Sequence, residues 1–296
     1  MCIRDSPTKQ EARIILQSLE QTMDAAGIVS AKTDARCLLG LALGRDMPVL
    51  PHEDLSPLDA GCQRHLSAML ERRLAGEPIS RIRGWREFWS LRFAISQSTL
   101  DPRPDSETMI QAAVTWAMAN SAQMDPLRCL DLGTGSGCLL LSLLSELPKA
   151  IGIGIDVSLD AIDVAVANAN SLGFGDRVHF HQHSFCDDLS NFGSFDIIIS
   201  NPPYIPTLDI AGLEVDVRDF DPALALDGGV DGMACWRGLL PRLGEPLSDE
   251  GAAFVEIGKG QEATVVQLAS NANLELVESH RDLSDVIRCL QFGIKM

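Results

Sequence analysis

The sequence predicts an α/β protein whose main part is a doubly wound, mostly parallel sheet of seven strands. From Arg128 onward, short apolar runs rich in β-branched residues alternate with helical patterns, which is typical of a sheet covered by helices on both faces. Residues up to about 76 show helical periodicity, and short aromatic and β-branched runs follow between Ile79 and Ser96. We therefore predict a small N-terminal helical domain over residues 1–76, a β-hairpin linker over 77–100 and the α/β domain over 101–296.

Three amphipathic helices are predicted in the first domain, because apolar residues recur there at intervals of three and four. Gly27 follows the first helix as a typical helix-ending residue, and Ser56 and Pro57 suit the N-cap and first helical position of the third. The predicted helices span residues 11–26, 33–43 and 56–74.

The hairpin is predicted to break at Gly84. The prolines in Asp101–Glu107 exclude regular structure there, and this stretch leads into a helix capped by Asp105 or Ser106.

In the α/β domain, helices are expected from Gly137, from Leu159 and over residues 261–270. Ligands of open α/β sheets bind at the carboxyl ends of the strands, so residues that directly follow a strand are the candidate site residues. The predicted strands are residues 128–132, 150–155, 177–182, 195–200, 252–257, 274–278 and 286–292.

Composition indicates a soluble, cytoplasmic protein. No apolar run is long enough to span a bilayer, and no signal peptide is apparent, so no membrane partner is expected. The eight cysteines are scattered singly without a C-x-x-C pair, which is typical of reduced thiols. His179, His181 and His183 alternate along one predicted strand and are interpreted as facing or edge residues, so no metal site is predicted.

The net charge of −17 makes binding to a phosphate backbone unfavourable over most of the surface. The stretch from Arg72 to Arg103 is an exception, with seven arginines against three acids. It either contacts an acidic partner or forms a solvated face with local ion pairs.

A glycine-rich loop closes the first strand of the sheet and opens the following helix. Its G-x-G-x-G spacing lets the backbone approach a ligand closely. Cys138 stands where the dinucleotide fingerprint has Gly or Ala, and no G-K-[ST] follows, so NAD, FAD and P-loop chemistry are disfavoured. The candidate cofactor-binding residues of this loop are Gly133, Thr134, Gly135, Ser136 and Gly137.

Asp156 ends the second strand, nineteen residues after Gly137, where a carboxylate can accept both ribose hydroxyls of a nucleoside. Its alternative role is that of a loop acid capping the next helix. After the third strand, Phe185, preceded by Ser184, is placed to contact an adenine ring or to pack in the core.

Asn201, Pro202, Pro203 and Tyr204 follow the apolar strand 195–200. The two prolines fix the backbone and remove two N–H donors, so the carbonyl groups of Asn201 and Pro202 are held stiffly with few local partners. The tetrapeptide can therefore bind an –NH2 group, although an Asn-Pro-Pro stretch can also simply end a strand.

These motifs together resemble the class I S-adenosylmethionine-dependent methyltransferases, and more narrowly the peptide chain release factor glutamine methyltransferases. The resemblance also rests on residues 76–89, on 102–107, on 221–232 and on Glu256-Ile257-Gly258, and it covers nearly the whole chain. It implies a Rossmann-like methyltransferase sheet, S-adenosylmethionine as cofactor and transfer of a methyl group to the N5 amide nitrogen of the Gly-Gly-Gln glutamine in class I release factors, which tunes translation termination.

By this resemblance, Gly133–Gly137 contact the methionine part of the cofactor, and Asp156 holds the ribose. Asn201–Tyr204 bind the substrate glutamine, with Asn201, Pro202 and Tyr204 catalytic and Asn201 also beside the cofactor. Two departures stand out: Ser184-Phe185 replaces a common Asp-Trp at the adenine wall, and Asp221 replaces a common Glu.

The main alternative is a nucleic-acid amino-methyltransferase acting on adenine N6 or cytosine N4, because those –NH2 groups are equally planar. A non-catalytic cofactor-binding protein is a second alternative, but both the donor and the acceptor motifs are intact. We expect a monomer whose partner is a release factor, docked on the helical domain and arginine-rich hairpin, with no direct contact to nucleic acid.

Overall fold

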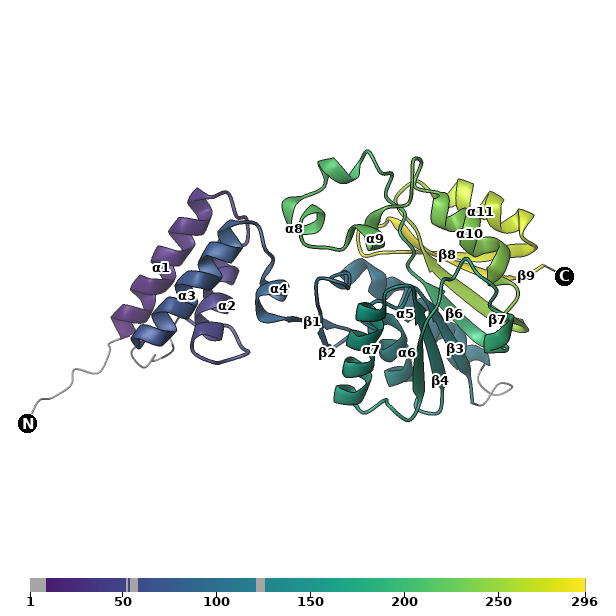
Figure 1. Ribbon diagram of the computed structural model, residues 1–296, viewed down its shortest axis with the longest axis horizontal. Helices are drawn as coiled ribbons and strands as arrows, with labels where there is room; N and C mark the ends of the chain where they lie inside the picture. Colours follow the sequence, from purple (N-terminus) through teal and green to yellow (C-terminus); the bar gives the residue numbers. More distant parts are fainter. Residues whose placement is uncertain (1–8, 52, 54–57, 121–125, 296) are drawn as a thin grey trace, which may run out of the picture. The chain divides into compact units, whose positions relative to one another are not determined.

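The computed structural model describes residues 9–51, 53, 58–120 and 126–295. The chain divides into two compact units, one up to Gly84 and one from Trp85 onward (Figure 1). The stretch expected to form a linker, residues 77–100, is therefore split between the two units.

The first unit is helical, as predicted. Apolar residues spaced three and four apart on the first two helices, such as Leu19 and Met23 or Ala35 and Leu38, form a buried core with Met69 of the third. Its helices are α1 (Lys9–Ala25), α2 (Ala31–Ala42), α3 (Ala60–Leu74) and α4 (Ile79–Arg83).

Ser56 and Pro57, the predicted start of the third helix, lie outside the described residues; within these, α3 begins at Ala60, and Asp59 caps it by accepting the Cys62 N–H at 2.8 Å. The prediction of extended structure from Ile79 was wrong for its first five residues. They form α4, which starts after the fixed φ of Pro78 and ends at Gly84 in the left-handed region.

The second unit begins with the predicted hairpin, made of β1 (Trp85–Phe88) and β2 (Leu91–Ala94) in antiparallel pairing. Its two turn residues, Trp89 and Ser90, both have positive φ. The predicted cap residues of the next helix, Asp105 and Ser106, lie in the 3₁₀ turn η1 (Pro104–Ser106), which runs directly into α5 (Glu107–Asn120).

The seven-stranded, mostly parallel sheet is confirmed. Its strand order is β5-β4-β3-β6-β7-β9-β8, and only β9 runs antiparallel to its neighbours. The strands are β3 (Arg128–Leu132), β4 (Ile151–Asp156), β5 (Val178–Gln182), β6 (Phe195–Ser200), β7 (Leu247–Glu256), β8 (Leu274–Arg281) and β9 (Ile287–Ile294).

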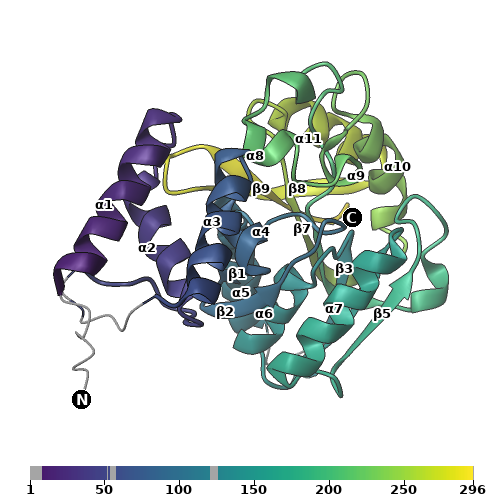
Figure 2. The same ribbon diagram turned by 60° about the vertical axis from the view of Figure 1, so that its left-hand side comes forward.

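Helices cover both faces of this sheet (Figures 1 and 2). Alternate strand residues point to opposite faces: Cys129, Ile197 and Ile199 pack with α5 and α6, whereas Leu130 and Ile198 pack with α10 and α11. The remaining helices are α6 (Cys138–Glu146), α7 (Leu159–Leu172), α8 (Val215–Arg218), α9 (Ala223–Leu226), α10 (Ala234–Leu243) and α11 (Glu262–Asn271), and the short turns are η2 (Ser190–Phe192) and η3 (Ile210–Gly212).

Across the described ranges, no helix combines the length and the apolarity that crossing a membrane requires.

Candidate active site

A cavity of about 530 Å³ lies at the carboxyl ends of the central parallel strands. Gly133 follows β3, Asp156 ends β4 and Asn201 follows β6, and all three line this cavity. The order of the sheet explains why: β4, β3 and β6 are neighbours, so the residues after them meet at one edge. The volume lies within the range of roughly 300–1,000 Å³ that is usual for small-molecule sites.

The glycine-rich loop is folded tightly against this edge. Gly133, Gly135 and Gly137 all have φ between +55° and +81°, a region that strongly favours glycine. The N–H groups of Gly133 and Thr134 both donate to the carbonyl oxygen of Ile155 at 2.9 Å, which anchors the loop to β4. Its first four residues line the cavity, whereas Gly137 is not among the lining residues.

Asp156 is held by two backbone donors. Its Oδ2 accepts the Gly135 N–H and its Oδ1 accepts the Ser158 N–H, both at 2.9 Å. Ser158 is the N-cap of α7, so Asp156 does support the start of that helix, and it also lines the cavity. Each carboxylate oxygen retains acceptor capacity, because an ionised carboxylate has about four lone-pair positions.

Beneath the loop lies a second carboxyl group, that of Asp131, which is 0 % exposed. Its Oδ2 accepts the hydroxyl of Thr134 at 2.7 Å, which fixes the loop from below. Burial, reinforced by the negative charge of Asp156, raises the pKa of Asp131 to about 7, although the Thr134 bond acts in the opposite direction.

Phe185 and Ser184, which follow β5, also line the cavity. A Cβ added at Gly133 would lie 3.6 Å from the Phe185 ring, so the ring and the glycine loop border the same space. The arrangement provides an apolar wall suited to a nucleobase.

The acceptor motif is divided between cavity and core. Asn201 and Pro203 line the cavity, and Pro202 is buried. Tyr204 does not line the cavity; its hydroxyl donates to Glu256 Oε1 at 3.2 Å, and its backbone oxygen accepts the Gln261 amide at 2.8 Å. Burial, and secondarily the charge of Glu256, raises the pKa of Tyr204, so this phenol stays protonated at neutral pH.

The segment after Asn201 is braced by a distant part of the chain. The Ile205 N–H donates to Leu226, and the Gly228 N–H donates to Ile205. A Cβ on Gly228 would lie 2.8 Å from the Tyr204 backbone, and one on Gly232 would lie 2.5 Å from the Tyr204 carbonyl oxygen. These glycines therefore allow the two backbones to approach closely.

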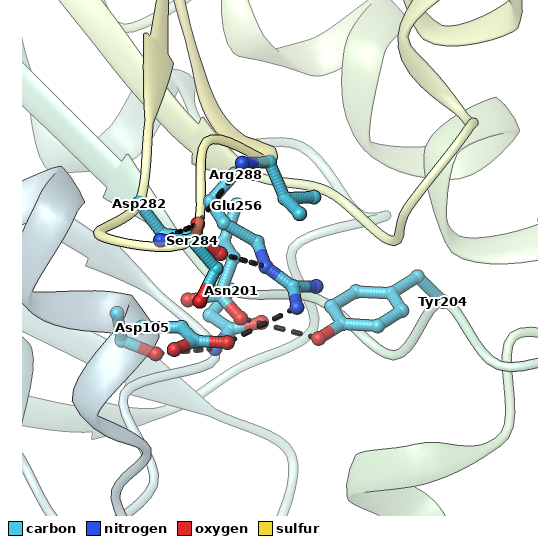
Figure 3. Close-up of polar contacts among 9 residues, drawn as sticks. Asp105, Asn201, Tyr204, Glu256, Asp282, Ser284 and Arg288 are labelled. Atoms are coloured by element: carbon cyan, nitrogen blue, oxygen red, sulfur yellow. Dashed lines mark hydrogen bonds and ion pairs between the residues drawn. The ribbon is translucent and has the colours of Figure 1, made fainter.

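Figure 3 shows a polar network behind Asn201. The Asn201 Nδ2 donates to Ser106 Oγ at 3.4 Å, and Glu256, at the end of β7, is 3 % exposed. Arg288 on β9 pairs with Asp105 and with Asp282, each at 3.0 Å. Asp105 precedes Ser106 in η1, so Arg288 attaches this turn to the sheet.

Several cavity residues were not singled out as site residues from sequence. Ser106, Gln97 and Arg103 precede the sheet, and Leu224 and Ala225 follow the acceptor motif. The signal for Arg103, Ser106, Leu224 and Ala225 in the sequence was membership of the conspicuous motifs around 102–107 and 221–232, whereas Gln97 lies outside both.

Arg103 is held by Asp221, the residue that departs from the common Glu. Asp221 is buried and accepts both the Arg103 guanidinium and the Asp101 N–H. The shorter carboxylate thus still fixes a cavity residue.

The three histidines that alternate in the sequence, His179, His181 and His183, do not line the cavity. His179 and His181 are exposed on the edge strand β5, and His183 contacts the Asp188 carbonyl at 3.2 Å. Within the described part of the chain, no group of His, Cys, Asp and Glu residues could hold a metal ion.

Comparisons with known proteins agree with this geometry. Residues 124–227 match a family described as a methyltransferase domain, and residues 15–84 match the PrmC N-terminal domain. A release factor glutamine methyltransferase of Bradyrhizobium diazoefficiens is 42% identical over 92% of this chain and 91% of its own length. One of Agrobacterium fabrum is 36% identical over 94% of this chain and 95% of its own. Among solved structures, the catalytic domain of hMettl16 bound to an RNA hairpin shares the fold, with a TM-score of 0.54, 15% identity and coverage of 79% of this chain and 82% of that one.

Proposed function

The chain belongs to the release factor glutamine methyltransferase family, and from this premise we propose that it methylates the side-chain amide nitrogen, N5, of the Gly-Gly-Gln glutamine in class I release factors. The main support for this proposal is that the glycine loop, Asp156 and Asn201 line the same cavity. We propose S-adenosylmethionine as the methyl donor and the cytoplasm as the compartment, with the protein acting as a monomer.

The residues at the cavity fit this cofactor. Two glycines with positive φ, Gly133 and Gly135, present backbone without side chains, and the Asp156 carboxylate can accept two hydroxyl groups. Phe185 offers an apolar face for a nucleobase. When bound, S-adenosylmethionine supplies an electrophilic methyl group on a positively charged sulfur.

Asn201 and Pro202 would position the acceptor. An amide nitrogen is a poor nucleophile, because its lone pair is delocalised into the carbonyl, so placement must do most of the work. The side-chain oxygen of Asn201 and the backbone oxygen of Pro202 each accept one N–H of the glutamine. This favours the positive charge that develops on nitrogen and directs its lone pair into the cavity.

For Tyr204 we propose a supporting role at the acceptor side. The motif suggests that its ring stacks on the planar amide, near the cationic centre. Its hydroxyl bond to Glu256 and the bond from Gln261 to its backbone oxygen hold the ring in one orientation.

The test is a single-turnover assay with labelled S-adenosylmethionine and a release factor. We expect Asn201→Ala to reduce turnover about a hundredfold or more, since removal of one preorganised group costs on the order of 3–4 kcal/mol. Cofactor affinity should stay within a few-fold. Asn271→Ala, on the exposed end of α11, is the matched control and should behave as wild type.

The nucleic-acid alternative is not favoured, because the relatives named above are release factor glutamine methyltransferases and the net charge is −17. Duplex DNA in a parallel reaction separates the two functions. Mass spectrometry should locate the label on the Gly-Gly-Gln glutamine; label on DNA, or on neither substrate, would contradict the proposal.

A further inference from the structure

The proposed mechanism requires that the side-chain oxygen of Asn201, and not its –NH2 group, faces the glutamine. A carboxamide has a carbonyl end and an –NH2 end of nearly the same shape, and only the carbonyl end accepts a hydrogen bond. If the amide turned over, its –NH2 would face the –NH2 of the glutamine, donor against donor. Some neighbour must therefore favour one orientation.

The backbone places Glu256 next to Asn201. Ser200 of β6 pairs with Val255 of β7, so the next residue on each strand, Asn201 and Glu256, lies at the same level of the sheet. Glu256 is buried, and one of its carboxylate oxygens, Oε2, has no hydrogen-bond partner. A buried acceptor of this kind favours any donor that can reach it.

Ser106 connects the two residues. Its Oγ accepts the Asn201 Nδ2 at 3.4 Å, so its own proton is available for another acceptor. The other oxygen of Glu256, Oε1, already accepts the Tyr204 hydroxyl at 3.2 Å. Burial raises the pKa of the Glu256 carboxyl above its usual value, although Ser106, Tyr204, the charge of Arg288 and Asn201 partly offset this increase.

We propose that Glu256 is a positioning residue, whose buried carboxyl group ends a chain of hydrogen bonds from Asn201 through Ser106 and so keeps the Asn201 carbonyl facing the cavity. Because Glu256 Oε2 is a buried acceptor with no partner, the chain runs one way: the Asn201 –NH2 donates to Ser106, and Ser106 donates to Glu256. The inference rests on the proposed function, in which Asn201 accepts the glutamine N–H.

Arg288 supports this chain from the far side. Its guanidinium joins Asp105, which precedes Ser106, to Asp282, whose Oδ1 also accepts the N–H groups of Ser284 and Val286 (Figure 3). The turn that carries Ser106 is thereby fixed to β9. The charge of Arg288 also acts on Glu256 and lowers the pKa of its carboxyl group, in addition to the hydrogen bonds from neutral donors.

The experiment measures kcat and KM with a glutamine peptide for Glu256→Gln, Ser106→Ala and the double variant. A glutamine at 256 can donate as well as accept a hydrogen bond, and an alanine at 106 interrupts the chain. Each change therefore removes the preference of the Asn201 amide for one orientation. We expect kcat to fall about tenfold or more in each single variant, with the KM for S-adenosylmethionine within about threefold of wild type. The double variant should be no slower than the slower single variant, because both changes break one chain.

Two further variants separate positioning from structural support. Ser106→Thr keeps the hydroxyl and should retain kcat within about threefold. Ser200→Ala is the matched control: its buried hydroxyl donates to the Leu132 carbonyl at 2.7 Å, one residue from Asn201 but outside the chain, and it should leave kcat unchanged.

A kcat within about twofold of wild type in either single variant, or a double variant that loses the product of both effects, would overturn the inference. If Glu256→Gln does not fold, the comparison of Ser106→Ala with Ser106→Thr decides. A wild-type protein that methylates neither the peptide nor a release factor contradicts the proposed function itself, whereas an active wild type with unaffected variants contradicts only the positioning role.

Discussion

The buried carboxyl group of Asp131 holds the glycine-rich loop through Thr134, and its ionisation lowers the stability of the folded state. Its pKa in the folded protein, about 7, lies above the ordinary value of 3.8. The folded state therefore binds the proton more tightly than the unfolded state. The resulting stabilisation is complete below about pH 4 and is lost as the pH rises towards 7.

We expect Asp131→Asn to remove this pH dependence. At pH 8 the variant should be more stable than wild type, by up to about 4 kcal/mol, because three pKa units correspond to about that free energy. Chemical denaturation at pH 4, 6 and 8 measures it, with Asp249→Asn on the exposed part of β7 as the control. An unchanged slope of unfolding free energy with pH would show that Asp131 does not carry the effect.

At this scale, sequence reasoning found the residues that directly follow strands, such as Asp156 and Asn201, because strand ends define the ligand edge. It did not find Ser106 or the role of Glu256. Ser106 lies 95 residues before its partner Asn201, and nothing local to either sequence shows that contact.

At the scale of elements, the acceptor segment depends on a glycine in another segment. Gly228 does not have positive φ, so glycine is required there only because there is no room for a side chain. A Cβ at Gly228 would lie 2.8 Å from the Tyr204 backbone. A side chain at Gly228 would therefore force the Tyr204 backbone to move.

Gly228→Ala should therefore displace the acceptor segment. We expect about a tenfold or greater loss of kcat with cofactor affinity within about threefold, since small misplacements of reacting groups are costly. Gly212→Ala is the control, because a Cβ at Gly212 would meet nothing within 4 Å. Equal kcat values for the two variants would contradict the bracing role.

Sequence patterns predicted the strands better than the short helices. Runs such as 195–200 are unbroken and β-branched, so their burial is evident from composition. Helix α4 has only five residues, too few for a helical period to show, and α10 contains Pro241, which argues against a helix from sequence alone.

At the scale of the whole molecule, the arginine-rich stretch is mostly paired internally. Four of its arginines form ion pairs with acids, namely Arg72 with Glu77, Arg73 with Asp34, Arg86 with Asp101 and Arg103 with Asp221. Arg81 is buried, and Arg92 lies over the Trp85 ring at 3.9 Å. Local ion pairs thus account for much of this charge, and docking of a release factor here stays a prediction.

Docking through this charge predicts a salt dependence. The KM for a release factor should rise several-fold between low and high salt, because exposed charges are screened beyond about 10 Å at 0.1 M salt. The KM for a short glutamine peptide should change little. Parallel responses of the two substrates would rule out an electrostatic contribution from a surface outside the catalytic cavity.

The position of β9 has a consequence for how the chain folds during synthesis. β9 lies between β7 and β8 in the sheet, although it follows both in sequence, and β8 has no other strand partner among the described strands. β8 therefore leaves the ribosome before the strand that connects it to the sheet exists. The strands that carry the glycine loop, Asp156 and Asn201 are made earlier, whereas Arg288 arrives with β9. A nascent chain can therefore form the strands that carry the glycine loop before Arg288 attaches the turn that carries Ser106.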